Sequence, residues 1–202
     1  MLNTRAPKTL LDIAWPQGAT ARSVGTVGAI LFGMCLLTLS AKIQVPFWPV
    51  PMTMQTLVVL VLAMAYGARL GAGTVLAYLM AGAAGMPVFA GTPEKGLGLA
   101  YMMGPTGGFL VGFLIAAWFV GSLAERGWDR SFLKCAVAMV AGNVVLLLSG
   151  LVWLSVLFGT TKAIEVGLLP FLASTALKTT LGAFLMPVVW RIAGRRSATQ
   201  QG

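Results

Sequence analysis

One lysine lies deep inside an apolar stretch near the end of the chain. Lys178 has no charged neighbour between residues 166 and 177 or between residues 179 and 190. If a helix starts near Pro170, Lys178 lies about 12 Å from that end, at a rise of about 1.5 Å per residue. An ionisable group at such a depth in a membrane costs about 3 kcal/mol, and this cost favours a functional role.

Ser174 and Thr175 share the helix face of Lys178, because they precede it by four and three residues. All five acidic residues lie in the N-terminal segment or in predicted loops, so none can neutralise the lysine within a helix. One interpretation is that an anionic ligand provides the missing counter-charge. The alternative is a lysine whose long side chain reaches the lipid headgroups.

A second group of candidate residues follows three closely spaced prolines. Pro46, Pro49 and Pro51 each lack a backbone donor and disfavour helix in the preceding residue. Non-helical backbone at membrane depth is normally buried in protein or lines a cavity. Thr53 and Gln55 are two residues apart, so extended backbone points them to one side. The stretch either closes a binding site or is a rigid connector between helices.

The composition predicts the environment in which these residues act. Of 202 residues, 58% are hydrophobic and only 9% are charged, whereas about a quarter are charged in soluble domains. We therefore expect one all-α domain in a lipid bilayer. The net charge of +9 is spread between apolar runs, which is typical of topology signals and does not indicate nucleic acid. The chain has no histidine, and we expect no metal, no cofactor and no catalytic site.

The apolar runs predict a bundle of six transmembrane helices. A tight turn at 67–71 separates the second and third spans, and irregular loops are expected at 90–107 and 159–167. A short interfacial helix is expected near residues 10–15. The predicted spans are 23–41, 52–66, 70–89, 108–123, 135–158 and 170–191. The division of the chain is then an N-terminal segment at 1–22, a membrane domain at 23–192 and a C-terminal tail at 193–202.

Small residues follow one face of the first span. Gly25, Ala29 and Gly33 are four residues apart, which lets another helix approach closely. That helix can belong to a partner protein or to this chain, and the spacing does not distinguish the two.

The distribution of lysine and arginine predicts the orientation. With both termini in the cytoplasm, ten basic residues lie inside and three outside, as the positive-inside rule requires. The three outside are Lys42, Lys95 and Lys162, and those inside are Arg5, Lys8, Arg22, Arg69, Arg126, Arg130, Lys134, Arg191, Arg195 and Arg196. The proline-rich and glycine-rich loops then both face outwards, which suggests a substrate pocket that is open to the outside and covered by loops.

Several motifs, taken together, make the chain similar to the BioY family, the biotin-specific substrate-binding (S) components of energy-coupling factor (ECF) transporters. The resemblance covers residues 24–192. It rests on Val45-Pro46, on Pro49-Val-Pro51-x-Thr53-x-Gln55-Thr56, on Tyr78-x-x-x-Gly82-Ala-Ala-Gly85-x-Pro87-Val-Phe89-Ala-Gly91, on Gly104-Pro-Thr-Gly-Gly108, on Gly167-x-x-Pro170-Phe171 and on Lys178.

The resemblance implies roles for particular residues. The family's last helix carries Gly-Asp-x-x-Lys, whose aspartate and lysine contact biotin, and this chain has Thr175 at the aspartate position and retains Lys178. Lys95 is the only cation of the glycine-rich loop, where relatives often have arginine. Ala29 and Gly33 would face the coupling subunit. The expected substrate-binding residues are Thr53, Gln55, Tyr78, Gly82, Phe89, Lys95, Asn143, Ser174, Thr175 and Lys178.

The resemblance therefore implies a biotin-binding S component in the cell membrane of a prokaryote. Its expected partners are the transmembrane coupling protein and the ATP-binding-cassette ATPases. The chain lacks the Gly-x-x-x-x-Gly-Lys-Ser/Thr loop that binds ATP phosphates. The alternatives are an S component or a stand-alone carrier for another anionic vitamin or a biotin precursor. An enzyme is not expected, because no nucleophile–base pair is visible.

Overall fold

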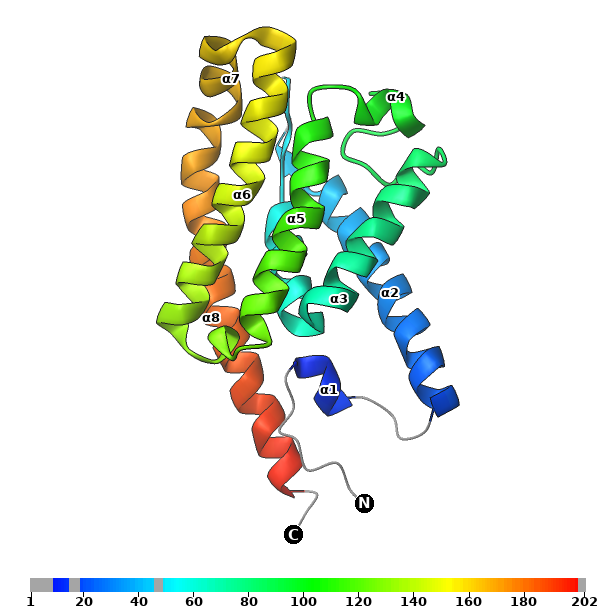
Figure 1. The fold of residues 1–202 in the computed structure, drawn as a ribbon, viewed down its shortest axis with the longest axis vertical. Coiled ribbons are helices and arrows are strands. Elements are labelled where there is room, and N and C mark those ends of the chain that lie inside the picture. The colour runs from blue at the N-terminus through cyan, green and yellow to red at the C-terminus, as the bar shows by residue number, and fades with distance from the viewer. Residues whose placement is uncertain (1–8, 15–18, 46–48, 200–202) are drawn as a thin grey trace.

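The computed structural model describes residues 9–14, 19–45 and 49–199, and this part of the chain is almost entirely helical (Figure 1). Two-residue strands, β1 (Gln44–Val45) and β2 (Met52–Thr53), form an antiparallel pair in the proline-rich stretch. The helices are α1 (Leu10–Ala14), α2 (Ala19–Lys42), α3 (Gln55–Ala83), α4 (Gly98–Met102), α5 (Gly107–Ala124), the 3-10 helix η1 (Trp128–Arg130), α6 (Phe132–Phe158), α7 (Thr160–Gly167) and α8 (Leu169–Thr199).

Within the described residues, five helices are long and apolar enough to cross a membrane, namely α2, α3, α5, α6 and α8. The protein is thus a multi-pass membrane protein with an all-helical fold. The sequence predicted six spans. The difference lies in α3, because this one helical element contains most of the predicted second and third spans, 52–66 and 70–89.

Helix α3 is broken at Gly67, and its two legs fold back on each other. Gly67 has φ +81° and ψ 177°, a conformation that favours glycine. A Cβ built on Gly71 would be 2.9 Å from the Cα of Ala63. Gln55 Nε2 is 2.6 Å from the hydroxyl of Tyr78, although a straight helix would separate these residues by about 34 Å. The legs are therefore antiparallel, which confirms the predicted turn.

The fold-back is held by α5, which packs between α3 and α6 in Figure 1. Glu125, at the end of α5, accepts a hydrogen bond from the backbone N–H of Ala68 (2.8 Å). One turn earlier, a Cβ on Gly121 would be only 2.6 Å from the Ala68 nitrogen. A larger side chain at Gly121 would thus separate α5 from the turn.

The opposite face of α5 also has small residues where it meets α6. A Cβ on Gly108 would be 2.6 Å from the carbonyl oxygen of Ser149, and one on Gly112 would be 3.0 Å from the Ser149 side chain. Close helix contact through small residues is how membrane bundles pack when burial of apolar surface provides little driving force.

Three sequence-based boundaries are corrected by the structure. Residues 160–167, predicted as part of a loop, form α7, in which Ala163 and Gly167 are buried. Helix α8 does not end near Arg191 but continues to Thr199, through most of the predicted tail. The glycine-rich loop contains the short helix α4. The short N-terminal helix is confirmed as α1, while Pro46 lies outside the described residues.

The row of small residues on α2 faces this chain's own α3 at two of its three positions. A Cβ on Gly33 would be 2.6 Å from Cγ2 of Thr74. The carbonyl of Ala29 accepts a hydrogen bond from the Tyr66 hydroxyl (3.0 Å). Ala29 and Gly33 thus pack within the chain, which was the alternative interpretation. The opposite face of α2 carries exposed residues such as Leu31.

Candidate functional site

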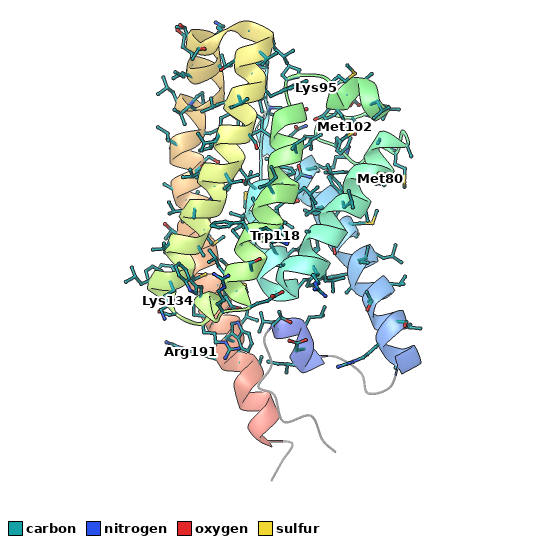
Figure 2. The ribbon with its side chains drawn as sticks, viewed as in Figure 1. Met80, Lys95, Met102, Trp118, Lys134 and Arg191 are labelled. Carbon is teal, nitrogen blue, oxygen red and sulfur yellow. The ribbon has the colours of Figure 1, made fainter. Side chains whose placement is uncertain are left out.

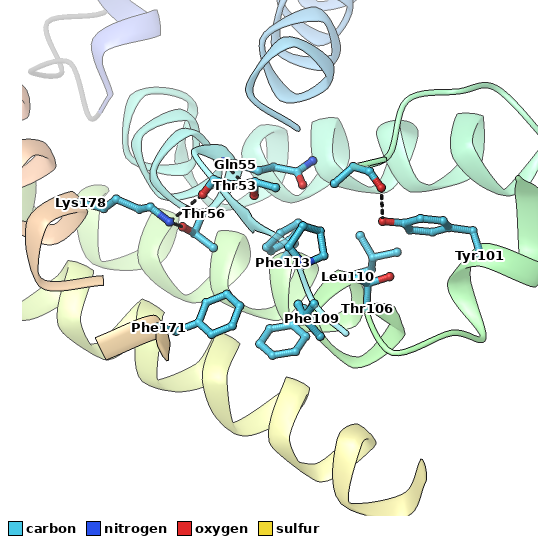
Figure 3. Close-up of a pocket in the computed structure, with 13 residues that line it drawn as sticks. Thr53, Gln55, Thr56, Tyr101, Thr106, Phe109, Leu110, Phe113, Phe171 and Lys178 are labelled. Carbon is cyan, nitrogen blue, oxygen red and sulfur yellow. Dashed lines mark hydrogen bonds between the residues drawn. The ribbon is translucent and has the colours of Figure 1, made fainter. Parts of the chain in front are cut away.

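We call the half of the bundle that contains α4 and α7 the loop end (Figure 1). A small cavity lies in this half, between the proline-rich stretch, Tyr101 of α4 and Phe171 near the start of α8. Its volume is about 50 Å³, and its walls come from the proline-rich stretch, α3, the segment between α3 and α5, α5 itself and α8. Figure 3 shows the lining side chains. They are Val50, Pro51, Thr53, Gln55, Thr56, Ala90, Tyr101, Thr106, Phe109, Leu110, Phe113, Phe171 and Lys178.

Lys178 provides the only charge among the described residues of the cavity wall. Its side chain points from α8 towards the start of α3 (Figure 3), and the residue is only 6% exposed. The ammonium group donates to the carbonyl oxygen of Thr53 (2.6 Å) and to Oγ1 of Thr56 (3.1 Å). Both acceptors are neutral. The one ion pair among the described residues joins Lys162 to Glu165 at the surface, so Lys178 is a buried cation without a carboxylate partner.

Aromatic rings form the apolar part of the cavity. Phe109 of α5 and Phe171 of α8 are stacked with their ring centroids 6.0 Å apart, and Phe113 lies one turn further along α5. On the far side, the Tyr101 hydroxyl donates to the carbonyl oxygen of Ala90 (2.8 Å; Figure 3). Burial raises the pKa of Tyr101, so its hydroxyl remains a protonated donor. The cavity suits a small, partly apolar molecule with one anionic or strongly polar group.

A hydrogen-bonded layer behind the wall holds Gln55 in place. Gln55 bonds to the hydroxyl of Tyr78 (2.6 Å), which in turn donates to the carbonyl oxygen of Val88 (2.9 Å). Phe89 packs edge-on to Tyr78 (centroids 5.5 Å apart) and stacks on Tyr101 (5.0 Å). Any Cβ on Gly82 would overlap the Phe89 ring, at 2.0 Å from Cζ. Tyr78, Gly82 and Phe89 thus position the wall but do not line it.

The structure divides the ten predicted substrate-binding residues into three groups: those that line the cavity, those directly behind its wall, and those away from it. Thr53, Gln55 and Lys178 meet at the cavity. Tyr78, Gly82 and Phe89 form the layer behind it.

The other four residues do not line the cavity. Asn143 is buried between α6 and α8, where its amide donates to the Met139 carbonyl (3.0 Å) and to Thr179 Oγ1 (3.1 Å). Ser174 and Thr175 are half-buried on α8. Lys95 is exposed at the loop end (Figure 2).

Another cation at the loop end, Lys42, contacts the wall of the cavity and was not among the predicted site residues. It lies at the C-terminal end of α2, and its ammonium donates to three oxygens of the turn that contains Ala90. These are the carbonyl oxygens of Phe89 (3.1 Å) and Thr92 (2.9 Å) and the Thr92 hydroxyl (3.1 Å). Lys42 thus ties α2 to one wall of the cavity.

The remaining wall residues were not predicted. Phe109 and Phe113 are four residues apart, which places them on one helix face, but this pattern also fits lipid contact. Tyr101 is a polar aromatic residue in a glycine-rich loop, and this feature could have marked it as a candidate binding residue. Thr56 follows Gln55 directly, and its role became visible only through the contact with Lys178.

Comparisons with known proteins agree with this architecture. The sequence profile of the BioY family matches residues 14–195. A "Biotin transporter BioY" of Thermotoga maritima is 36% identical over 151 residues, covering 74% of this chain and 86% of the relative. Another from Rhizobium etli is 37% identical over 158 residues, covering 74% and 82%. A "Probable biotin transporter BioY" of Pyrococcus horikoshii is 34% identical over 152 residues, covering 75% and 88%.

The fold also resembles a solved structure. A crystal structure described as the S-component for biotin from an ECF-type ABC transporter superposes with a TM-score of 0.73. The match covers 87% of this chain and 95% of that chain, with 22% identity. At this identity the similarity concerns the fold. The profile match over most of the chain, together with the extensively covered relatives, shows that the chain belongs to the BioY family.

Proposed function

We propose that the protein takes up biotin as the high-affinity substrate-binding component of an ECF-type transporter. The observation that carries the proposal is Lys178, a buried cation that faces an aromatic cavity and has only neutral partners. Relatives that cover most of this chain are named biotin transporters. A transporter component also agrees with the helical membrane fold.

Biotin has the chemical groups that this cavity would bind. Its fused rings suit the stacked pair Phe109 and Phe171, and its carboxylate and ureido oxygen are acceptors for the ammonium of Lys178. The cavity volume of about 50 Å³ is far below the roughly 300–1,000 Å³ of typical small-molecule sites. Its walls must therefore separate when a vitamin enters, and they come from several segments that can move apart.

A thermal-shift assay with a panel of vitamins tests this function. A ligand that binds only the folded state raises the stability by mass action, by about 2.7 kcal/mol at a hundredfold excess over Kd. Biotin should raise the melting temperature more than any other vitamin does. A larger shift with dethiobiotin or with another anionic vitamin would assign the site to that molecule. This alternative substrate is worth testing because Thr175 replaces the family's aspartate.

The proposal includes an arrangement in the membrane. The antiparallel legs of α3, together with the other four long helices, give six crossings, with both termini in the cytoplasm of a prokaryotic cell and the loop end outside. The coupling protein would contact the exposed face of α2, because Ala29 and Gly33 are occupied by α3. The ATPases would supply the energy for uptake.

Cysteine labelling tests the orientation. In a variant with Cys35 and Cys135 replaced by alanine, Lys95→Cys should react with an impermeant thiol reagent applied to intact cells, whereas Arg126→Cys should not. Both positions are exposed, and the charge distribution places them on opposite sides of the membrane. Both should react after the cells are permeabilised. Labelling of Arg126→Cys in intact cells would show that the proposed orientation is wrong.

A further inference from the structure

A second and larger cavity lies at the opposite end of the molecule, where α1 is found beneath the fold-back of α3 (Figure 1). We call it the interfacial cavity. Its volume is about 370 Å³, and its polar lining includes Arg22, Tyr66, Arg69 and Glu125, with Asp12 on the α1 side. Nothing in the uptake of a vitamin at the loop end requires it.

The cavity lies at the depth of the lipid headgroups. Arg22 is the second residue of the apolar span that begins at Ala21. Tyr66 and Arg69 flank the break of α3 at Gly67, where the helix turns back into the bundle. Arginine and tyrosine at the ends of spans are typical of the membrane–water interface. The part of a molecule most available to this cavity is therefore a lipid headgroup.

The walls of the interfacial cavity are fixed by hydrogen bonds. The Tyr66 hydroxyl donates to the carbonyl oxygen of Ala29 (3.0 Å) and so ties α3 to α2. Glu125 Oε1 accepts from the Ala68 N–H (2.8 Å) and ties α5 to the turn of α3. On the α1 side, Asp12 accepts from the backbone N–H of Thr9 (2.9 Å). The lining is thus held in place by the fold itself.

The two arginines, in contrast, make no direct ion pair with the described residues. Arg22 and Arg69 are exposed, and neither forms an ion pair with a carboxylate of the described residues. Guanidinium groups bind phosphate oxygens in a bidentate manner. Arg22 comes from α2 and Arg69 from α3, so a single phosphate bound between them would bridge the two helices.

The charge of the lining also selects among phosphates. Among the described residues of the lining, the two arginines are matched in number by Asp12 and Glu125, which gives no net charge. A purely anionic group would meet repulsion from the carboxylates, whereas a group that carries both a phosphate and an ammonium would match both signs. Glu125 uses only Oε1 for the Ala68 N–H, which leaves its other oxygen for a donor.

We propose that the interfacial cavity binds a phosphoethanolamine group, with its phosphate on Arg22 and Arg69 and its ammonium on Glu125. The carrier of this group is a membrane lipid, phosphatidylethanolamine. The bound headgroup would hold α2 against the turn of α3. This inference is independent of which molecule occupies the cavity at the loop end.

Native mass spectrometry of the purified full-length chain tests the site with defined lipids. Phosphatidylethanolamine should be retained more strongly than phosphatidylcholine, whose methylated ammonium cannot donate hydrogen bonds, and than phosphatidylglycerol, which lacks a cation. The double variant Arg22→Gln/Arg69→Gln should bind phosphatidylethanolamine about tenfold or more weakly, since charge-assisted hydrogen bonds to the phosphate are lost. The matched control Arg126→Gln/Arg191→Gln removes two exposed arginines outside the cavity and should bind like the parent.

A third variant tests the ammonium contact separately. Glu125→Gln retains an oxygen that can accept from the Ala68 N–H but removes the charge. It should lose the preference for phosphatidylethanolamine over phosphatidylcholine while remaining folded by circular dichroism. If folded Glu125→Gln keeps that preference, the assignment of the ammonium to Glu125 is wrong. Equal retention of phosphatidylethanolamine by the two double variants would overturn the whole site.

Soluble probes distinguish the source of the group. Millimolar O-phosphoethanolamine or inorganic phosphate should not raise the melting temperature of the parent, because a lipid is held by its acyl chains as well. If O-phosphoethanolamine stabilises the parent but not Arg22→Gln/Arg69→Gln, and the lipid is not retained, the carrier is a soluble phosphate ester and the lipid assignment is overturned.

Discussion

Replacement of Lys178 by methionine is expected to weaken biotin binding by about two orders of magnitude. The ammonium is the only charge that the described part of the chain contributes to the wall of the cavity. Loss of one partner from a desolvated, charged contact costs about 2–5 kcal/mol, and about 1.4 kcal/mol corresponds to a factor of ten. Methionine retains the apolar stem, so the packing of α8 against α3 should change little.

Isothermal titration of purified protein measures this effect. The matched control is Lys162→Met, which removes an exposed lysine of α7 whose ion pair is at the surface, and it should bind biotin like the parent. The melting temperature without ligand should be nearly unchanged in Lys178→Met, since the two lost hydrogen bonds to Thr53 and Thr56 are offset by removal of a buried charge. If Lys178→Met binds biotin as tightly as the parent, Lys178 serves only to hold α8 to the start of α3.

Thr175→Asp examines the departure from the family motif. Thr175 is half-buried on α8, three residues before Lys178, and does not line the cavity. A carboxylate at this position should tighten the binding of biotin, because it accepts hydrogen bonds from the ureido N–H groups with the help of its charge. Complete loss of biotin binding in this variant would show that the cavity is shaped around another substrate.

The largest loss of stability is expected for Gly121→Ala. The added methyl group would be 2.6 Å from the nitrogen and 2.7 Å from the Cα of Ala68. Both atoms belong to the backbone of the α3 turn, which cannot rotate away as a side chain can. Overpacking of this kind typically costs about 1–3 kcal/mol. We expect the upper end of this range, about 3 kcal/mol, because moving α5 away from the turn would also lengthen the hydrogen bond between Glu125 and the Ala68 N–H.

The melting temperature of Gly121→Ala in detergent, measured without ligand, reports this cost. The control is Gly28→Ala on α2, where an added Cβ meets no atom within 4 Å. This substitution should be neutral or slightly stabilising, because alanine is favoured over glycine in helices by up to about 1 kcal/mol. A Gly121→Ala protein as stable as the parent would mean that α5 can move away from the turn at little cost.

The sequence was most informative where its signals are local. The run of apolar residues with a turn at 67–71 predicted the fold-back of α3, and the isolated charge of Lys178 predicted a functional lysine deep in the last span. The helical character of 160–167 was missed because the segment is short and polar. It packs against α6, where Leu154 lies against Gly167, and this contact is not visible in the local sequence.

Other parts of the site depend on contacts between distant segments. Lys42 and Thr92 are 50 residues apart, and no local pattern joins them. Lys95 was chosen because it is the cation of the glycine-rich loop, but its stem packs on Gly91 outside the cavity. The aromatic pair Phe109 and Phe171 comes from two helices, and each residue alone is indistinguishable in sequence from one that faces lipid.

The break at Gly67 has a consequence for how the chain is inserted during synthesis. As one straight helix, the 29 residues of α3 would be about 44 Å long, more than enough to cross a hydrocarbon core of about 30 Å once. A single crossing there would invert every later helix, including α8 with Lys178, relative to α2. In the orientation proposed above, the turn at Gly67, with Arg69 two residues beyond it, would make this stretch enter as a hairpin, so that the cavity at the loop end opens to the outside.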